Sequence, residues 1–426
     1  MNFRFLKNNK EIKNAGWLIF GKVGQMLISL FVGILTARYL GPSNYGLISY
    51  ASAYVAFFSS FCTLGINSII IKDFVDNPQD EGTAIGSSLV LRALSSLLSS
   101  ITIILIVAIL DKDESQTIVV TSLCSISLIF QIFDTFTYWF QAKYLSKITA
   151  IATFSAYTIV SIYKVILLLL NKSVEWFAFA TSLDFICLGI FLYFVYKKYK
   201  GPKLRFSFSK SRALLSRSYN FILSGMMVAI YGQTDKLMIK QMLDEAEVGY
   251  YSIGTTISSM WVFILAAIIQ SIYPTIMQLH RTNKEAYIRK NIQLYSIVIY
   301  LSFSASLLFT IAGDQIVNIM YGEEFKNSSN VLKLITWYTA FSYLGVARNA
   351  WIVCEHKQKY LKYIYLAAAV LNVSCNLIFI PIYGACGAAL ASLVTEISTS
   401  IILPFFIKEM RENSIMILKS FVFKFG

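Results

Sequence analysis

Long apolar runs, separated by short charged segments, fill most of this chain of 426 residues and limit what it can fold into. A membrane-spanning helix needs roughly 20 mostly apolar residues. Twelve segments meet that requirement: 15–39, 46–71, 87–110, 117–140, 148–170, 176–196, 219–242, 248–273, 292–312, 331–353, 363–382 and 385–407. Each is expected to be a helix, because irregular backbone cannot satisfy its polar groups in lipid. Only 14% of the residues are charged and 56% are hydrophobic, too little polar material to cover a soluble core. The sequence therefore predicts an all-α polytopic membrane protein.

Basic and acidic residues are divided between the two sides of the predicted helices. With the N-terminus in the cytoplasm, the cytoplasmic segments hold most of the 37 Lys and Arg residues, while the opposite loops are acidic. This asymmetry follows the positive-inside rule and predicts that both termini are cytoplasmic. The net charge of +14 lies in short connecting segments rather than on one face of a folded domain, so we do not expect a nucleic-acid partner.

The longest basic stretch divides the chain into two halves of six predicted helices each. Residues 197–217 contain eight Lys and Arg residues and no acid, and such a segment is attracted to an anionic inner leaflet. We therefore expect a lobe at 1–196, a basic cytoplasmic linker at 197–218, a second lobe at 219–407 and an amphipathic cytoplasmic tail at 408–426.

A short pattern recurs at the same place in both halves. The segments 40–49 and 243–252 follow the first helix of each half and share three residue types at a constant offset: Leu40 and Leu243, Gly46 and Gly249, Ser49 and Ser252. Because six spans is an even number, the two halves point the same way and form a parallel repeat. Alternating access requires a cleft between two such bundles, so the repeat indicates a transporter.

Three segments of the chain resemble a known family. They are Gly16 through the run Leu40-Gly41-Pro42-x-x-Tyr45-Gly46, the segment 232–239 followed by Val248-Gly249-Tyr250-Tyr251-Ser252, and Tyr321-Gly322-Glu323-Glu324-Phe325. In this order, over nearly the whole chain, they are similar to the polysaccharide (oligosaccharide-repeat) flippases. That family shares a superfamily with the multidrug exporters of the MATE type and the lipid II flippases. The lipid II branch typically has two further C-terminal helices, so the resemblance favours the polysaccharide branch.

The resemblance implies a MATE-like fold, with about twelve helices in two pseudo-symmetric six-helix lobes. It also implies a function, the translocation of undecaprenyl-diphosphate-linked oligosaccharide repeat units of O-antigen (lipopolysaccharide) or capsule across the bacterial inner membrane. The implied partners are this lipid-linked oligosaccharide, membrane lipids, and the polymerase and chain-length proteins of the glycan pathway.

Charged residues inside the predicted spans are candidates for substrate contacts. An ionisable side chain in mid-bilayer costs roughly 2.5–3.5 kcal/mol on insertion scales, so it requires a partner, a wet cavity or a route to the surface. The substrate-binding candidates are Lys22, Arg38, Arg92, Asp235, Lys236 and Arg348. Their cationic surplus suits a diphosphate, which guanidinium groups bind bidentately, and it disfavours cationic drugs.

Several of these candidates also have a purely structural interpretation. Lys22 can snorkel to the cytoplasmic surface, Arg38 can anchor the outer rim, and Arg348 can be an interfacial charge. Arg92 can pair with Asp134 between the third and fourth helices.

Two further pairs have a structural and a functional interpretation each. Asp235 and Lys236 are neighbours on the seventh helix. Either each pairs with another helix, or Lys236 meets the anionic groups of the substrate while Asp235 orients it or carries a proton. Lys164 and Asp184 lie at matching depths on the fifth and sixth helices. They either join those helices as an ion pair, or Asp184 serves ion coupling.

The sequence gives no indication of catalysis. It has no glycine-rich phosphate loop, His280 and His356 lack metal-ligand spacing, and no nucleophile–base pair stands out. We therefore expect no enzyme, no cofactor and no metal. Two alternatives to a flippase are a multidrug or small-molecule cation/proton antiporter of the MATE type and a membrane-embedded glycan polymerase. The polymerase would ordinarily show a larger outer loop than the segment 313–330. The sugars carried and the coupling ion stay open.

Overall fold

The computed structural model of the chain describes residues 10–422, leaving aside the side chains of residues 10–20, Lys22, Ser68, Asn220, Leu223 and Ser224. Every regular element between residues 10 and 422 is a helix, and none is a strand. The prediction of an all-α polytopic membrane protein is confirmed.

The helices divide between two compact units. Among the described residues, unit 1 comprises 10–40 and 47–229, and unit 2 comprises 41–46 and 230–422. The first unit contains α2 (Lys10–Thr63), α3 (Asn67–Asp76), α4 (Glu81–Leu110), α5 (Ser115–Phe130), the 3-10 turn η1 (Gln131–Phe133), α6 (Asp134–Ala142), α7 (Ser146–Leu169) and α8 (Val174–Lys198). Helix α9 (Phe208–Met242) begins in unit 1 and ends in unit 2. The second unit contains α10 (Glu245–Ser259), α11 (Val262–Thr282), α12 (Lys284–Tyr321), η2 (Glu323–Phe325), α13 (Ser328–Cys354), η3 (Gln358–Tyr360), α14 (Leu361–Tyr383), α15 (Ala385–Ile397), the π-helical segment η4 (Ser398–Ile402), α16 (Leu403–Phe406) and α17 (Arg411–Ser420).

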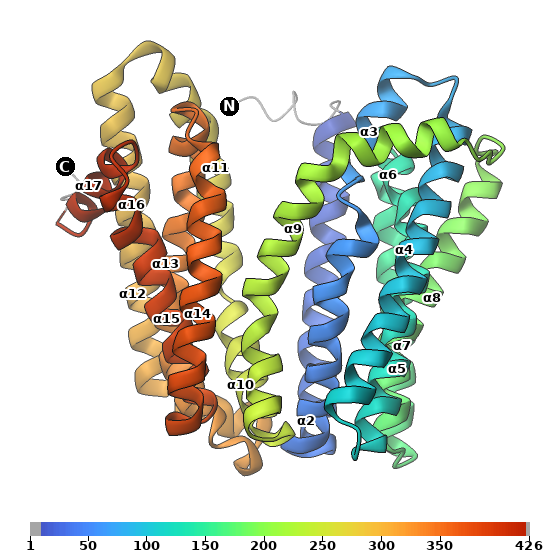
Figure 1. Cartoon of the computed structure of the whole chain (residues 1–426), viewed down its shortest axis with the longest axis horizontal. Helices are drawn as coiled ribbons and strands as arrows, with labels where there is room; N and C mark the ends of the chain where they lie inside the picture. The colour runs from blue at the N-terminus through green and yellow to red at the C-terminus, as the bar shows by residue number, and fades with distance from the viewer. Residues whose placement is uncertain (1–9, 423–426) are drawn as a thin grey trace. The chain divides into compact units, whose positions relative to one another are not determined.

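Nine stretches in the described part of the chain are long and apolar enough to cross a membrane. One lies in α2, which contains two predicted spans joined at Gly41, where the backbone leaves the helix (φ 68°, ψ 176°) just before Pro42. Two further predicted spans, 219–242 and 331–353, lie in α9 and α13, which are helical but are not among the nine. Apart from short breaks, all the predicted spans that fall on described residues are therefore helical (Figure 1).

In unit 1 an aromatic cluster joins α6 to α8 close to the start of α4. The ring of Tyr196 packs against Phe136, with centroids 4.5 Å apart, and against Trp139 at 5.1 Å. The Trp139 indole donates to Glu81 Oε2 at 2.8 Å, and Lys143 pairs with Oε1 of the same carboxylate at 2.5 Å. Both oxygens of this buried acid are thus satisfied, as a buried charge requires.

The segment predicted to be a basic linker is partly helical and packs on unit 1. Helix α8 continues to Lys198 and α9 begins at Phe208, so only residues 199–207 are outside helices. The backbone N–H of Ser207 donates to the Ser87 hydroxyl of α4 at 3.1 Å, and that hydroxyl donates to the Ser207 carbonyl at 3.3 Å. The first turns of α9 then run across the ends of unit 1 helices (Figure 1).

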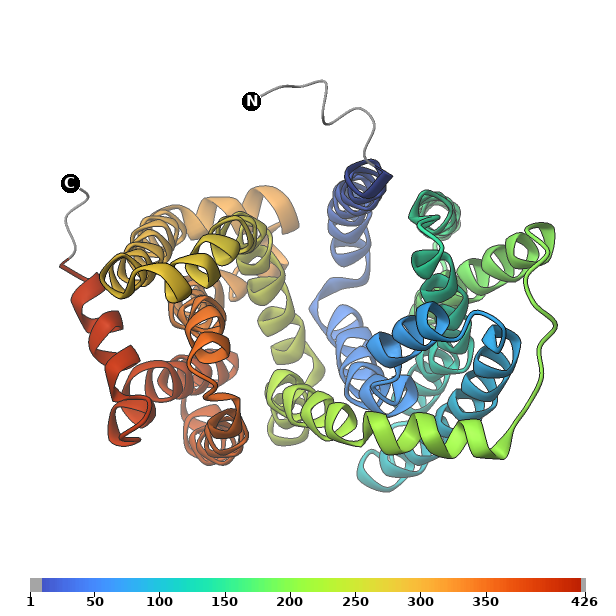
Figure 2. The same cartoon turned by 90° about the horizontal axis from the view of Figure 1, so that it is seen from above.

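Unit 2 is a helical bundle onto which the C-terminal helix folds back. Helix α13 packs between α12 and α15, and Trp351 of α13 is fully buried in the core. Helix α17 lies against α12: Asn413 donates to the Tyr295 hydroxyl at 2.7 Å, and the Ser296 hydroxyl donates to the Ser420 carbonyl at 2.8 Å. Part of the segment predicted to be an amphipathic tail is therefore a helix docked on unit 2 (Figure 2).

Candidate functional site

A buried carboxylate in unit 2 is the acceptor for four side-chain donors. Asp235 of α9 is 6% exposed. Its Oδ1 accepts hydrogen bonds from the amides of Asn372 (3.1 Å) and Asn376 (2.7 Å) of α14. Its Oδ2 accepts from the hydroxyls of Tyr251 of α10 and Ser392 of α15, both at 2.5 Å. Four helices thus converge on one acid, and hydrogen bonds to a charged acceptor are stronger than those between neutral groups.

The cluster around Asp235 also contains oxygen atoms that can serve as ligands. Asn376 donates to Asn372 Oδ1 at 3.1 Å, and its own Oδ1 is buried with no hydrogen-bond partner in the described part of the chain. Carboxylate, amide and hydroxyl oxygens are hard ligands suited to cations without thiolate or imidazole chemistry. No three His, Cys, Asp or Glu side chains gather into a metal site among the described residues. The surroundings of Asp235 therefore combine one carboxylate with neutral amide and hydroxyl groups from three other helices.

A second acid of unit 2, Glu396, was missed in the sequence. Glu396 of α15 accepts from the Tyr231 hydroxyl of α9 at 2.9 Å and from the Ser400 hydroxyl at 3.3 Å. The charges of Glu396 and Asp235 both act on the Tyr338 hydroxyl of α13, so one tyrosine connects the surroundings of the two acids. The signal that could have found Glu396 is a single acid in the middle of the apolar run 385–407.

Arg348 of α13 is bonded to a break in a neighbouring helix. Its Nη1 donates to the carbonyls of Thr399 (3.3 Å) and Ser400 (3.2 Å), which belong to the π-helical segment η4 after α15. The side chain is 4% exposed, so the residue expected at an interface is instead inside unit 2. A π-helical turn disturbs the regular ladder of hydrogen bonds, and the guanidinium supplies partners for two of its carbonyls in an apolar interior.

Arg92 of α4 has the same role in unit 1. The turn η1 separates α5 from α6, and Arg92 Nη2 donates to the Gln131 carbonyl at that break, at 2.8 Å. Its Nη1 donates to Thr135 Oγ1 at 3.1 Å, and Nη2 lies 3.8 Å from the carboxylate of Asp134. The structure thus brings Arg92 and Asp134 together. Arg92 is 1% exposed, so its guanidinium is committed to the α5–α6 joint.

The remaining charged candidates are held less tightly. Lys236 follows Asp235 in α9 and is half-buried, and no hydrogen bond or ion pair ties its ammonium group to any residue that the structure describes. Lys164 of α7 and Asp184 of α8 act on each other's charge, yet they form no ion pair. Unlike the two buried arginines, these three side chains form no hydrogen bond or ion pair with a side chain that the structure describes.

Two candidates are on α2. Arg38 is exposed in unit 1, and Lys22 lies outside the residues whose side chains the structure describes. The structure therefore divides the substrate-binding candidates into Lys22, Arg38 and Arg92 in unit 1, the side chain of Lys22 not being described, and Asp235, Lys236 and Arg348 in unit 2.

Comparison with known proteins relates this chain to proteins of polysaccharide biosynthesis. The family described as "Polysaccharide biosynthesis protein" matches residues 12–280. The probable low-salt glycan biosynthesis flippase Agl15 of Haloferax volcanii is 23% identical over 193 residues, which is 44% of this chain and 40% of that relative. The chain therefore matches less than half of that relative's length.

Two solved structures share the fold over nearly the whole chain. The lipid II flippase MurJ in an inward closed conformation superimposes with a TM-score of 0.72 at 15% identity, covering 96% of this chain and 93% of that chain. An inward-facing multidrug resistance transporter of the MATE family gives a TM-score of 0.70 at 14% identity, covering 93% and 96%. The expected MATE-like fold is confirmed. Because the family match covers well over half of its residues, the chain belongs to the polysaccharide biosynthesis protein family.

Proposed function

We propose that this protein is a flippase that moves a lipid-linked glycan between the leaflets of a membrane. The observation that carries the proposal is a polysaccharide-family match over residues 12–280 in a chain whose described part is almost entirely helical, with nine apolar spans. Sugar transfer or hydrolysis needs paired catalytic groups on a water-exposed surface. Asp235, a charged residue within a predicted span, is instead buried between helices, which is the usual arrangement in a transport pathway.

The finer proposal concerns the cargo and the membrane. We propose an undecaprenyl-diphosphate-linked oligosaccharide repeat unit of O-antigen or capsule, moved across the bacterial inner membrane with both termini in the cytoplasm. Lys236 supports an anionic cargo, since the residue is half-buried and its ammonium group has no described partner. Arg38 and Lys22 stay candidates for the same role. The polymerase and chain-length proteins of the glycan pathway are proposed partners.

The buried arginines have a different place in this proposal. Arg92 and Arg348 each donate to the carbonyls of a helix break and are almost fully buried. We assign them to positioning of those helices rather than to direct contact with a diphosphate.

The Asp235 cluster is proposed as the site of the coupling ion. A proton or a monovalent cation at Asp235 would replace the hydrogen bonds from Tyr251 and Ser392, and so loosen the contacts between α9, α10 and α15. Such a change at one acid can bias an alternating-access equilibrium, provided that the ion binds the two states differently. The pair Lys164 and Asp184 is a second candidate for coupling, in unit 1.

A MATE-type antiporter of cationic drugs or small molecules is the second candidate function. It is favoured by one observation, the presence of two acids within the helices of unit 2, Asp235 and Glu396, each bonded to a tyrosine hydroxyl. Acidic and aromatic side chains together are the groups that bind a cationic ligand.

Deleting the gene in its host separates the two functions. A flippase is expected to cause loss of surface glycan and accumulation of lipid-linked repeat units on the cytoplasmic leaflet, both reversed by the wild-type gene. Lys236→Gln is expected to complement poorly, whereas Lys198→Gln, which removes the same charge at the exposed end of α8, is expected to complement fully. Normal surface glycan with raised drug sensitivity in the deletion strain would contradict the flippase and support the antiporter.

A further inference from the structure

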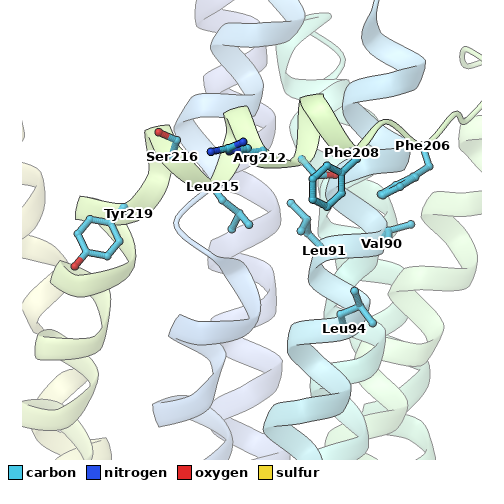
Figure 3. Close-up of a pocket in the computed structure, with 10 residues that line it drawn as sticks. Val90, Leu91, Leu94, Phe206, Phe208, Arg212, Leu215, Ser216 and Tyr219 are labelled. Atoms are coloured by element: carbon cyan, nitrogen blue, oxygen red, sulfur yellow. The ribbon is translucent and has the colours of Figure 1, made fainter.

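A groove of about 730 Å³ opens in unit 1 between α4 and the segment that leads into α9. Figure 3 shows its walls: Leu94 extends from α4, and Phe208, Leu215 and Tyr219 extend from α9. Arg212 of α9 is the charged residue of the lining. The volume is within the range of small-molecule sites.

The walls of this groove are fixed by backbone contacts. A side chain at Gly82 or Gly86 of α4 would overlap the carbonyl oxygens of Lys203 and Arg205, so the segment before α9 lies directly on the first turns of α4. The Lys210 ammonium ties the start of α9 to Asp73 at 2.8 Å. The groove therefore belongs to the packing of unit 1.

The lining exposes apolar side chains that water does not cover favourably. Leu94 is 63% exposed, Phe208 76% and Tyr219 60%. The same face of α4 continues with exposed Leu98 and Ile101, one and two turns further along the predicted span. Large exposed apolar surface on a spanning helix faces hydrocarbon, so the groove is continuous with the lipid-facing side of α4.

The segment that carries the charge of the groove is basic, and the acids Asp73 and Asp80 beside its start are paired with Lys210. The stretch 197–217 contains eight Lys and Arg residues and no acid, and Arg212 is the member of that stretch that reaches the lining. Beside it the Ser216 hydroxyl is exposed on the same helix. A guanidinium with an adjacent hydroxyl donor matches a phosphate ester, to which arginine binds through two parallel hydrogen bonds.

We infer that this groove binds one anionic phospholipid of the surrounding membrane. An acyl chain lies along Leu94, Phe208 and Tyr219, and the phosphate lies at Arg212 and Ser216. The site does not depend on the transport function proposed above. With this site, the basic stretch 197–217 would bind one specific lipid, in addition to its general attraction to an anionic leaflet.

Native mass spectrometry of the full chain in detergent tests the inference, with phosphatidylglycerol and phosphatidylcholine of identical acyl chains as probes. We expect one phosphatidylglycerol to be retained in preference to phosphatidylcholine. Arg212→Gln is expected to weaken that retention about tenfold or more, as loss of a charged hydrogen bond predicts. Lys198→Gln, a matched loss of charge outside the groove, is expected to change it little.

A second variant tests the apolar part of the site. Ser216→Trp places a large ring in the groove from an exposed position, so it is expected to abolish retention of phosphatidylglycerol while the melting temperature stays that of the wild type. Equal losses in Arg212→Gln and Lys198→Gln, or unchanged retention in Ser216→Trp, would overturn the inference. Displacement of phosphatidylglycerol by an equimolar polyprenyl phosphate would also overturn it, because the occupant would then be a carrier lipid.

Discussion

Gly46 and Gly249 are equivalent positions of the two halves. Each lies in a corner of the chain, 40–49 or 243–252, and packs against the backbone of the other corner. A Cβ atom at Gly46 would overlap the Glu245 carbonyl oxygen, and one at Gly249 would overlap the Pro42 carbonyl oxygen. Pro42 and Glu245 are separated by the same offset as the two glycines, so the contact is reciprocal. Reciprocity of this kind is the property of a two-fold contact. The weak sequence repeat therefore reflects a pair of corners that pack on each other inside unit 2.

The third family-like segment completes that contact. The ring of Phe325 lies edge-to-face with Tyr45 of the first corner, at 6.2 Å, and with Tyr250 of the second, at 6.5 Å. Phe325 is fully buried. One aromatic side chain thus packs beneath both corners, which gives a structural reason for three resemblances far apart in the sequence.

The corner contact predicts that both glycines are intolerant of a side chain. Gly46→Ala and Gly249→Ala are each expected to lower the free energy of unfolding by about 1–3 kcal/mol, because the added methyl meets backbone that cannot rotate away. The double variant should lose less than the sum, since both changes open one contact. Thermal unfolding of the full chain in detergent measures this. Gly232→Ala is the control: apart from its own helix, no described atom lies within 4 Å of its Cβ position, and alanine favours a helix by about 1 kcal/mol. A Gly249→Ala protein that melts like Gly232→Ala would contradict the prediction.

Arg92 is predicted to be a stability residue of unit 1. Arg92→Ala leaves the Gln131 carbonyl and the Asp134 carboxylate without a cationic partner, and breaking a buried pair costs about 3–5 kcal/mol. Because Asp134 is 25% exposed, we expect the lower end, about 3 kcal/mol. Arg92→Lys should recover only part of the lost free energy of unfolding. An ammonium group does not span the three acceptors, which are on Gln131, Thr135 and Asp134. Arg205→Ala, at an exposed arginine, is the control and should stay within about 0.5 kcal/mol of wild type in chemical unfolding. Similar losses in the two alanine variants would refute the assignment.

The negative charge of Asp235 is predicted to stabilise the fold. Asp235→Asn keeps the shape of the side chain but presents an amide to four donors, and is expected to cost about 1–3 kcal/mol of unfolding free energy. It should also remove any stabilisation that the wild type gains from a monovalent cation, because such stabilisation is linked to ion binding. Thermal unfolding across a series of sodium and potassium concentrations is the measurement. Thr234→Ala, which loses only a bond to its own helix at Ile230, is the control. An Asp235→Asn protein with an unchanged response to these cations would exclude this carboxylate as the ion site.

An ion cluster at the start of α9 predicts the pH dependence of unit 1. Lys210 pairs with Asp73 at 2.8 Å and with Asp80 at 3.0 Å. Hydrogen bonds from Thr83 and then from Lys210 hold the pKa of Asp80 below its ordinary 3.8. Burial lowers the pKa of Lys210, but its hydrogen bonds to Asp73 and Asp80 outweigh burial and raise it above its ordinary 10.5.

The directions of the pKa shifts of Asp80 and Lys210 give an acid limit and an alkaline limit to the stability of the fold. An acid with a depressed pKa stabilises the fold above its unfolded pKa and loses that contribution as the pH falls. A lysine with a raised pKa stabilises the fold below its unfolded pKa and loses that contribution as the pH rises through the folded pKa. We therefore expect the melting temperature of the wild type to fall in acid below 3.8 and in alkali above 10.5. Lys210→Met should make the fall of the melting temperature smaller both in acid and in alkali, while Lys198→Met should leave its dependence on pH unchanged. Identical pH profiles for Lys210→Met and the wild type would show that the cluster contributes nothing.

Lys164 of α7 and Asp184 of α8 are predicted to be only weakly coupled. The two side chains act on each other electrostatically without an ion pair. A double-mutant cycle with Lys164→Ala and Asp184→Ala should therefore give a coupling energy in unfolding below about 1 kcal/mol. A coupling of several kcal/mol would instead establish a direct pair that holds α7 to α8.

The sequence by itself determined the class of fold, because the bilayer makes only simple demands on a chain. Each of the long apolar runs had to satisfy its own backbone, so its helical state followed from length and composition, as for 87–110 within α4. The family also followed from residues alone, since the segments around Gly41, Asp235 and Gly322 lie in order along the chain.

Which charges are available to a ligand was decided only by the tertiary structure. In the sequence Arg92, Lys236 and Arg348 look alike, each a cation in an apolar run. Packing bonds the two arginines to helix breaks and leaves the lysine without a described partner. Breaks such as η1 and η4 arise where neighbouring helices supply new partners for the freed carbonyls. Those partners come from helices distant in sequence, so no local pattern could have revealed them.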